Sequence, residues 1–226
     1  MVAVTGDIHG DFERFNKNDV KKLKKGDTLI VCGDFGLVWD GSAEEEKKLK
    51  ALGKRKYQTL FLDGVHENFE LLKSYPVTGF MGGKARVINK NLVHLMRGEV
   101  YTIEDRTFFC MGGGTSADKD FRMKNNTWWE EEAPSEEELD NGTKNLEKHN
   151  NFVNYVITFE APAKLKRILS MSYDGSGGDD ISNLNTYLER INGNITFDRW
   201  YFGCHHLDKV ITPMHSCVYG ELVEIK

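Results

Sequence analysis

The stretch that decides the fold is VAVTGDIHG, residues 2–10. Its first four residues are all small or β-branched, which predicts a short buried strand. Gly6 ends that strand, and Asp7 and His9 follow it directly. A carboxylate and an imidazole placed together at the end of a buried strand are candidate ligands for a divalent metal ion.

Polar residues follow three more predicted strands in the same way. These strands are expected at Thr28–Cys32, Tyr57–Leu62 and Arg199–Phe202. The residues that follow them are Gly33-Asp34, Asp63-Gly64-Val65-His66-Glu67-Asn68 and Gly203-Cys204-His205-His206. Because the carboxyl ends of neighbouring parallel strands meet in one crevice, these side chains are expected to form a nitrogen and oxygen cage for a divalent transition metal.

Helical patterns separate the first three strands. Helices are expected at Asp11–Lys25, Ser42–Lys56 and Glu67–Ser74. In the first of these helices, Phe12, Phe15 and Leu23 would face inward. The alternation of strands and helices is typical of a parallel sheet with helical crossovers. After Pro76, short strands spaced like hairpins or a meander are expected at Ala85–Ile88, Leu92–Leu95, Glu99–Ile103 and Thr107–Met111.

One well-marked helix lies in the later part of the chain. Ser135 and Glu138 match a capping box, so a helix is expected over Glu136–Asn150. Strands are expected at Val153–Thr158, Lys209–Thr212 and Cys217–Ile225, a helix at Ile181–Ile191, and a mobile glycine-rich loop at Asp174–Asp180. Since no repeat and no change of composition divides the chain, a single domain over residues 1–226 is expected.

The composition argues against several classes of protein. Apolar residues make up 39% of the chain, enough for a hydrophobic core. The formal net charge of −5 disfavours general electrostatic binding of nucleic acid. There is no signal-peptide pattern and no apolar run near the ~18 residues of a membrane span, so no membrane partner is expected. The 4 cysteines form no CxxC pair, which favours free thiols and a cytoplasmic location.

The ordered motifs resemble those of the calcineurin-like metallophosphoesterases, which run G-D-x-H, G-D, G-N-H-E, a histidine after a late strand, and G-H-x-H. Four further segments resemble the small bacterial and phage-type members of that family. They are Tyr75-Pro76-Val77, Gly82-Gly83-Lys84, His94-Leu95-Met96-Arg97-Gly98 and Trp128-Trp129. The resemblance implies an α/β (α+β) fold, a four-layer α/β/β/α sandwich with metals at the strand ends, and hydrolysis of phosphate esters by a metal-activated water.

The resemblance also implies a ligand set for two metal ions. The first seat would be formed by Asp7, His9, Asp34 and His206, all of which are present. In the second seat, the family's asparagine and two histidines are replaced by Val65, Phe159 and Cys204. Valine and phenylalanine side chains have no lone pair to offer, so one well-formed seat for Mn, Fe or Zn is expected.

The second seat leaves alternatives open. Cys204 could bind a metal as a thiolate, and His205 could take the place of the missing histidine. Asp63, Asn68 or Glu160 could also supply a ligand. A metal count of two per chain would indicate such a rebuilt seat.

The resemblance implies a catalytic role for His66, which would protonate the leaving oxygen. Asp63 is the candidate carboxylate that orients His66. Arg97 is a candidate phosphate clamp because a guanidinium can bind phosphate through two parallel hydrogen bonds, with a surface salt bridge as the alternative.

Three functional hypotheses follow. The first is a metal-dependent phosphatase-like hydrolase that acts on a phosphorylated substrate with one ion. The second is a catalytically weak or inactive scaffold that acts by binding a protein, with Trp128-Trp129 beside Glu130–Glu132 as the candidate docking surface. The third is a full two-metal enzyme with a rebuilt second seat.

Overall fold

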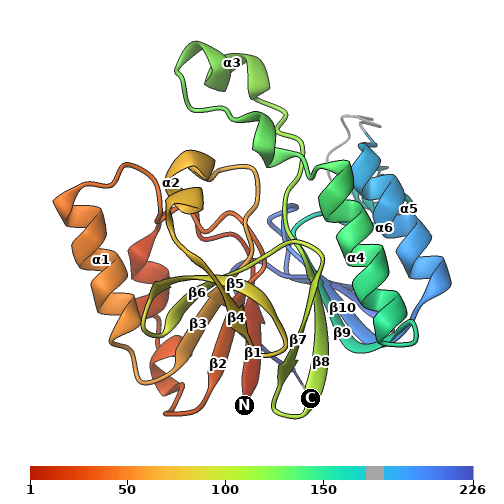
Figure 1. The fold of residues 1–226 in the computed structure, drawn as a ribbon, viewed down its shortest axis with the longest axis horizontal. Helices are drawn as coiled ribbons and strands as arrows, with labels where there is room; N and C mark the ends of the chain where they lie inside the picture. Colours follow the sequence, from red (N-terminus) through yellow and green to blue (C-terminus); the bar gives the residue numbers. More distant parts are fainter. Residues whose placement is uncertain (172–180, 226) are drawn as a thin grey trace.

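A computed structural model describes residues 1–171 and 181–225, which form two mixed β-sheets with helices on their outer faces (Figure 1). The expected glycine-rich loop at Asp174–Asp180 lies outside the described residues. Most of the expected strands and helices are confirmed within a few residues of their predicted ends.

The first sheet has seven strands in the order β13-β1-β2-β3-β6-β5-β4. They are β1 (Val2–Thr5), β2 (Thr28–Val31), β3 (Gln58–Phe61), β4 (Val77–Phe80), β5 (Gly83–Asn89), β6 (Leu92–Leu95) and β13 (Val223–Ile225). Strands β1, β2, β3 and β6 run parallel, and the other three join through antiparallel pairs. The predicted parallel sheet is therefore confirmed.

The second sheet has six strands in the order β11-β12-β10-β9-β8-β7. They are β7 (Glu99–Ile103), β8 (Arg106–Met111), β9 (Phe152–Thr158), β10 (Thr196–Phe202), β11 (Lys209–Thr212) and β12 (His215–Cys217). Strands β8, β9, β10 and β12 run parallel.

Of the two arrangements expected after Pro76, hairpins are confirmed, because β5 pairs with β6 and β7 with β8 in antiparallel fashion, whereas a single meander is wrong. Strands β5 and β6 lie in the first sheet, whereas β7 and β8 lie in the second. The reason is that β6 is buried along its whole length and pairs with β3 in the interior of the first sheet. The chain then crosses to the other sheet between Leu95 and Glu99.

The expected strand Cys217–Ile225 is also split between the two sheets. Asp208 accepts hydrogen bonds from the backbone N–H groups of Tyr219 and Gly220, both at 2.8 Å, and so stabilises a turn in the middle of the segment. Strand β12 ends before this turn in the second sheet, and β13 pairs with β1 in the first.

Six α-helices are described: α1 (Ala43–Gly53), α2 (Phe69–Ser74), α3 (Lys119–Lys124), α4 (Glu136–Lys148), α5 (Ala163–Leu169) and α6 (Asn183–Asn194). The predicted capping box is confirmed, because Ser135 and Glu138 bond each other's backbone N–H. The longest helix in the described part of the chain has 13 residues, fewer than the ~20 needed to cross a bilayer.

The helix expected at Asp11–Lys25 is wrong. Two short 3₁₀ helices, Phe12–Asn16 and Val20–Lys22, occupy this segment. The side chains of Asp11 and Asp19 bond nearby backbone N–H groups, which starts a new turn at each position, and Lys17 between them is extended. The apolar pattern of the segment therefore reports burial rather than a continuous helix.

Alternating side chains along the strands fill three hydrophobic cores. Leu29 and Val31 of β2 face α1 and α2, whereas Ile30 faces the second sheet. In β8, Phe108 faces the first sheet and Phe109 faces the helices α4, α5 and α6. Two helical layers thus enclose two sheets, which confirms the four-layer α/β/β/α sandwich (Figure 1).

The register of the strands sets the level at which their loops begin. In the first sheet, Thr5, Val31 and Phe61 lie opposite one another at the carboxyl ends of β1, β2 and β3. In the second sheet, Met111, Thr158 and Phe202 do the same for β8, β9 and β10. Six loops therefore leave the two sheets from matching positions, which is the arrangement needed to build a shared site.

Candidate metal centre

The six loops surround one cavity of about 720 Å³. The first sheet contributes the residues that follow β1, β2 and β3, and the second contributes those that follow β8, β9 and β10. The residues that line the cavity include His9, Asp34, His66, Asp118, Phe159 and His206. The gathering of strand-end residues expected from the sequence is therefore present.

Asp34 holds two neighbouring loops in place. Its backbone carbonyl accepts hydrogen bonds from the N–H groups of Ile8 at 3.0 Å and His9 at 2.8 Å. Its side-chain Oδ1 accepts from the N–H groups of Val65 at 2.6 Å and His66 at 2.8 Å. The loops after β1 and β3 are thus both bonded to the loop after β2.

Glu67, in the loop after β3, also joins this loop to the loop after β2. Its fully buried carboxylate accepts from the N–H groups of Phe35 at 2.7 Å and Gly36 at 3.2 Å, both in the loop after β2. Burial raises the pKa of Glu67 well above its usual range. The sequence motif contains this glutamate, but no role for it was predicted.

Three of the predicted ligands converge on one point. Nε2 of His9 lies 3.0 Å from Nε2 of His206, which in turn lies 3.1 Å from Oδ2 of Asp7. A cation bound about 2.1 Å from each atom, with its ligands at right angles, would separate neighbouring ligand atoms by about 3 Å. The spacing of these three side chains therefore fits a single divalent cation.

The carboxylate of Asp7 supports this fit. It is buried, with an exposed fraction of 1%, and Oδ1 accepts a hydrogen bond from the backbone N–H of Cys204. Oδ2 faces Nε2 of His206 at 3.1 Å, and no other donor among the described residues bonds it. Burial raises the pKa of Asp7. A buried carboxylate charge is costly, and a cation bound beside it would offset that cost.

Several residues of the site have a strained backbone conformation. His9, Asp34, Cys204 and His206 have φ values of 50°, 44°, 66° and 49°, in the left-handed region that few non-glycine residues adopt. Each such residue costs about 1–3 kcal/mol, and strain of this kind is characteristic of functional sites. The folded chain retains it at three of the four predicted ligands of the first seat.

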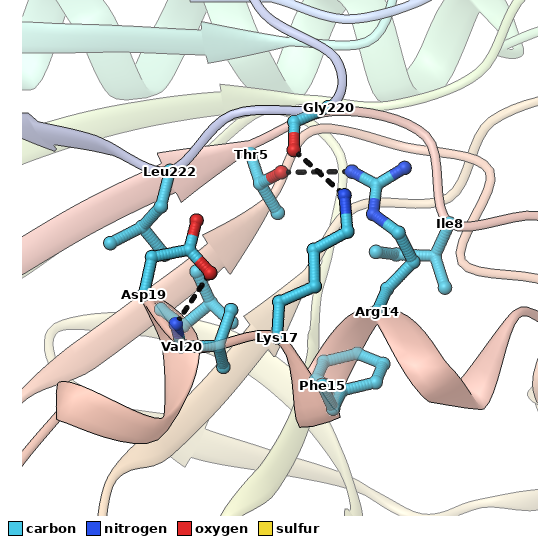
Figure 2. Close-up of a pocket in the computed structure, with 10 residues that line it drawn as sticks. Thr5, Ile8, Arg14, Phe15, Lys17, Asp19, Val20, Gly220 and Leu222 are labelled. Carbon is cyan, nitrogen blue, oxygen red and sulfur yellow. Dashed lines mark hydrogen bonds between the residues drawn. The ribbon is translucent and has the colours of Figure 1, made fainter.

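Arg14 fixes the loop that carries Asp7. Its guanidinium donates to the backbone carbonyl of Asp7 and to Oγ1 of Thr5, each at 3.2 Å. Figure 2 shows Arg14 beside Thr5 and, next to it, Lys17 donating to the carbonyl of Gly220. These bonds join the first loop to the segment that leads into β13.

Asp34 and His66 form a second, adjoining group with His9. Nδ1 of His66 lies 2.7 Å from Oδ2 of Asp34, and Nδ1 of His9 lies 3.7 Å from the same oxygen. His9 therefore faces Asp7 and His206 with Nε2 and faces Asp34 with Nδ1. The hydrogen bond with Asp34 raises the pKa of His66. Asp34 thus adjoins the first group, and its nearest side-chain partner is His66.

Phe159 and Val65 fill the space beside Asp34 where the family would place a second ion. A Cβ built on Gly33 would lie 2.2 Å from the Phe159 ring, so the ring rests directly on the backbone of this loop. A Cβ on Gly114 would lie 3.0 Å from Val65 and 3.1 Å from Phe159. Both apolar side chains are buried. Hydrocarbon occupies this part of the site.

The polar alternatives for a second seat already have partners. Glu160, Cys204 and His205 lie close enough to share an ion. However, Lys166 lies 2.9 Å from the carboxylate of Glu160, and Asn185 donates to it at 2.9 Å. Burial raises the pKa of the Cys204 thiol well above its usual range. A binding role for Cys204 and His205 stays a prediction.

Asn68 supports a helix. Its Oδ1 accepts from the backbone N–H of Leu71 at 3.0 Å and caps α2, while its amide donates to the carbonyl of Trp39 at 2.6 Å. Both ends of this side chain are thus engaged at the start of the helix.

The structure contradicts the expected contact between Asp63 and His66. Asp63 is buried and accepts from Nε2 of His94 at 2.9 Å and from Arg97 at 2.6 Å and 2.8 Å. Burial alone would raise the pKa of Asp63, but the charge of Arg97 and the bond from His94 outweigh it and hold that pKa below its usual range. Asp63 belongs to a buried ion-pair network.

The expectation that Arg97 clamps phosphate is contradicted for the same reason. Its side chain is only 5% exposed and also lies 3.0 Å from the carboxylate of Glu138. Another of its donors bonds the carbonyl of Glu131 at 2.7 Å. With its donors taken, Arg97 joins the end of β6 to the start of α4.

The carboxylate near the free side of His66 is Asp118, a residue that no motif indicated. Oδ2 of Asp118 lies 3.7 Å from Nε2 of His66. Asp118 lies in the long segment between β8 and α4, which includes α3 and projects above the sheets in Figure 1. Because this residue comes 52 positions after His66 in an irregular segment, sequence spacing gave no sign of the contact.

The two tryptophans of the expected docking surface, Trp128 and Trp129, are half-buried and pack against other residues of the protein. Trp129 packs edge-to-face on Trp39, with ring centroids 5.9 Å apart. Lys119 lies 4.2 Å from the centroid of the Trp128 ring. Protein docking at this surface stays a prediction.

Comparison with known proteins identifies one family. A family model described as calcineurin-like phosphoesterase matches residues 1–170. No curated protein matches the chain. The match includes the loops of Asp7, Asp34 and His66 and stops before His206. The proximity of His206 to Asp7 is thus a finding of the structure.

The buried network around Asp63 generates a stability prediction. Asp63→Asn removes the buried carboxylate that pairs with Arg97 and leaves only the more exposed Glu138 beside it. We therefore expect a loss of about 3–5 kcal/mol in the free energy of unfolding, measured by urea titration at pH 7. The pKa of Asp63 is lower in the folded chain, so its contribution should be present above pH ~4 and should fall as the solution is acidified below that value. The exposed control Asp198→Asn should change stability by less than about 1 kcal/mol. Equal stability of the two variants would contradict the structural role.

The filled second seat generates a prediction of metal stoichiometry. We expect one divalent ion per chain by elemental analysis after equilibration with Mn²⁺ and gel filtration. The triple variant Val65→Asn, Phe159→His and Cys204→His restores the family's ligands and should raise the count toward two. Its control changes the same positions to Ala, Leu and Ala and should stay at one. Two ions in the unaltered protein would show that the seat is rebuilt from other residues.

Proposed function

Because the chain belongs to the calcineurin-like phosphoesterase family, we propose that it is a metal-dependent hydrolase of phosphate esters that works with one firmly bound cation. The observation that carries the proposal is the convergence of Asp7, His9 and His206, in which a buried carboxylate oxygen and two imidazole nitrogens face one another at 3.0 Å and 3.1 Å. Nitrogen and carboxylate ligands suit Mn, Fe or Zn.

A cation held there would act as a Lewis acid toward the phosphoryl group and lower the pKa of a water molecule. The chain's own contribution is to fix the ligands through Arg14 and the Asp34 loop, so that they need little rearrangement. The cavity of about 720 Å³ beside them lies in the size range of small-molecule sites. We infer that the alcohol part of a small phosphorylated substrate occupies this cavity.

We infer that His66 donates a proton to the leaving oxygen. Asp34 holds Nδ1 of the ring at 2.7 Å, so Nε2 is the nitrogen left to act, and the ring is one of the residues that line the cavity. As water adds to phosphorus and the bond from phosphorus to the leaving oxygen breaks, Nε2–H passes its proton to that oxygen. The attacking water releases a proton to solvent, from which His66 recovers its own.

A single cation limits the rate. The family's second ion would neutralise charge on the transferring phosphoryl group, and losing about 4 kcal/mol of such stabilisation costs about a thousandfold in rate. Esters with good leaving groups are therefore the best substrates. The apolar filling by Phe159 and Val65 also favours the second candidate, a weak or inactive scaffold that binds a protein.

The four cysteines are free thiols, and three of them are buried. Unpaired thiols suit a reducing compartment, so we propose that the protein acts in the cytoplasm.

The proposal predicts metal-dependent turnover. The purified protein supplied with Mn²⁺ should hydrolyse 4-nitrophenyl phosphate, and EDTA should abolish the reaction. Asp7→Asn should lose both the bound ion and the activity, because it removes a buried anionic ligand. His66→Ala should keep the ion and lower kcat on phenyl phosphate, whose leaving group is poor, by about 10²–10⁴-fold, the range for loss of a general acid.

The control for these variants is His149→Ala, at the far end of α4, which should leave turnover unchanged. Activity on phenyl phosphate that survives both Asp7→Asn and His66→Ala would contradict the hydrolase assignment. A bound ion without turnover on any ester, with Mn, Fe or Zn, would favour the scaffold.

A further inference from the structure

Asp118 lies on the side of His66 from which a proton would leave. Its Oδ2 is 3.7 Å from Nε2, while Asp34 lies 2.7 Å from Nδ1 on the opposite side of the ring. The imidazole is therefore flanked by one carboxylate at each nitrogen. A separation of 3.7 Å is longer than a hydrogen bond, but contacts of this kind often shorten only when substrate is bound.

The side chain of Asp118 does not cap helix α3, although the residue stands at the capping position. The residue directly precedes α3, where an aspartate usually accepts a hydrogen bond from the first turn of the helix. Here the carboxylate makes no such bond. It points instead toward the cavity, which it lines together with His66. Removing the carboxylate should therefore cost the helix little.

The segment that carries Asp118 is held in place by a buried ion pair. Arg122 of α3 lies 3.1 Å from the carboxylate of Glu132, and both side chains are at most 4% exposed. The same carboxylate accepts from the N–H of Ser116 at 2.9 Å and from its hydroxyl at 2.7 Å. Residues on both sides of Asp118 are thus fixed to Glu132, which limits where Asp118 can lie.

We propose that Asp118 is a positioning residue that holds Nε2–H of His66 toward the leaving oxygen. The inference rests on the proposed function. Before the reaction, the carboxylate attracts Nε2–H and keeps the ring in the orientation that faces the cavity. As the bond from phosphorus to the leaving oxygen breaks, the proton moves from Nε2 to that oxygen, and His66 is later reprotonated by solvent. Because Phe159 and Val65 fill the neighbouring space, this proton is the main means of neutralising the leaving oxygen.

The first test compares leaving groups. Loss of proton donation matters most for an ester whose leaving group is a poor one. Asp118→Ala should therefore lower kcat for phenyl phosphate by about tenfold or more and for 4-nitrophenyl phosphate by less than about threefold, with KM nearly unchanged for both. The control Asp120→Ala removes an exposed carboxylate from the same helix and should leave both values unchanged. Equal losses of kcat for the two esters would overturn the inference.

A double-mutant cycle tests whether Asp118 acts through His66. In the His66→Ala background, Asp118→Ala should cause no further loss of kcat on phenyl phosphate. A further loss as large as in the unaltered background would show that the two residues act independently, and would overturn the inference.

A spectroscopic test does not depend on turnover. In the metal-free protein, the ¹⁵N signals of the His66 ring can be assigned by their absence in His66→Ala. Asp118→Ala should shift the Nε2 signal, and Asp120→Ala should not. An unshifted signal would overturn the inference even if the wild-type protein hydrolyses both esters. If no ester is hydrolysed but Asp118→Ala shifts the Nε2 signal, the proposed function is wrong, whereas the contact between Asp118 and His66 is confirmed.

Discussion

The site depends on an exchange of carboxylate bonds between two neighbouring loops. Asp34, after β2, accepts from backbone N–H groups in the loop after β3, and Glu67, after β3, accepts from N–H groups in the loop after β2. Each carboxylate is buried, so water cannot compete for these bonds. The carbonyl of Asp34 also holds the loop of His9. Three strand ends of a parallel sheet are thereby joined into one rigid unit.

Much of this arrangement could be predicted from local signals. The apolar runs and the glycines that end them located the strands, and Ser135 with Glu138 located the start of α4, because each signal lies within a few residues of its effect. The misassigned roles of Asp63 and Arg97 have a different cause. The sequence motifs predicted that both residues act in the site. Their ion pair instead depends on burial and on the contact of Arg97 with α4, which sequence spacing does not encode. Asp118 could not be found because an irregular segment carries it.

The positions that correspond to the two metal seats of the family differ in this chain. Where Asp7, His9 and His206 converge, the polar atoms face one another and the backbone stays strained. Where the resemblance would place a second ion, the ring of Phe159 packs on the backbone of Gly33. Burial of an aromatic ring stabilises the fold, so the chain gains core packing at the position where it gives up charge.

The pairing of β13 with β1 has a consequence for biosynthesis. Ile225 lies opposite Val2, and the N–H of Gly6 bonds the carbonyl of Tyr219 at 3.1 Å, so the strand before Asp7 is bordered by residues made more than 200 positions later. Contacts of such long range slow folding. While the chain is being translated, β1 offers an open edge and the carboxylate of Asp7 remains in water. The emerging polypeptide therefore passes through a period in which it can neither retain a cation nor resist edge-to-edge association.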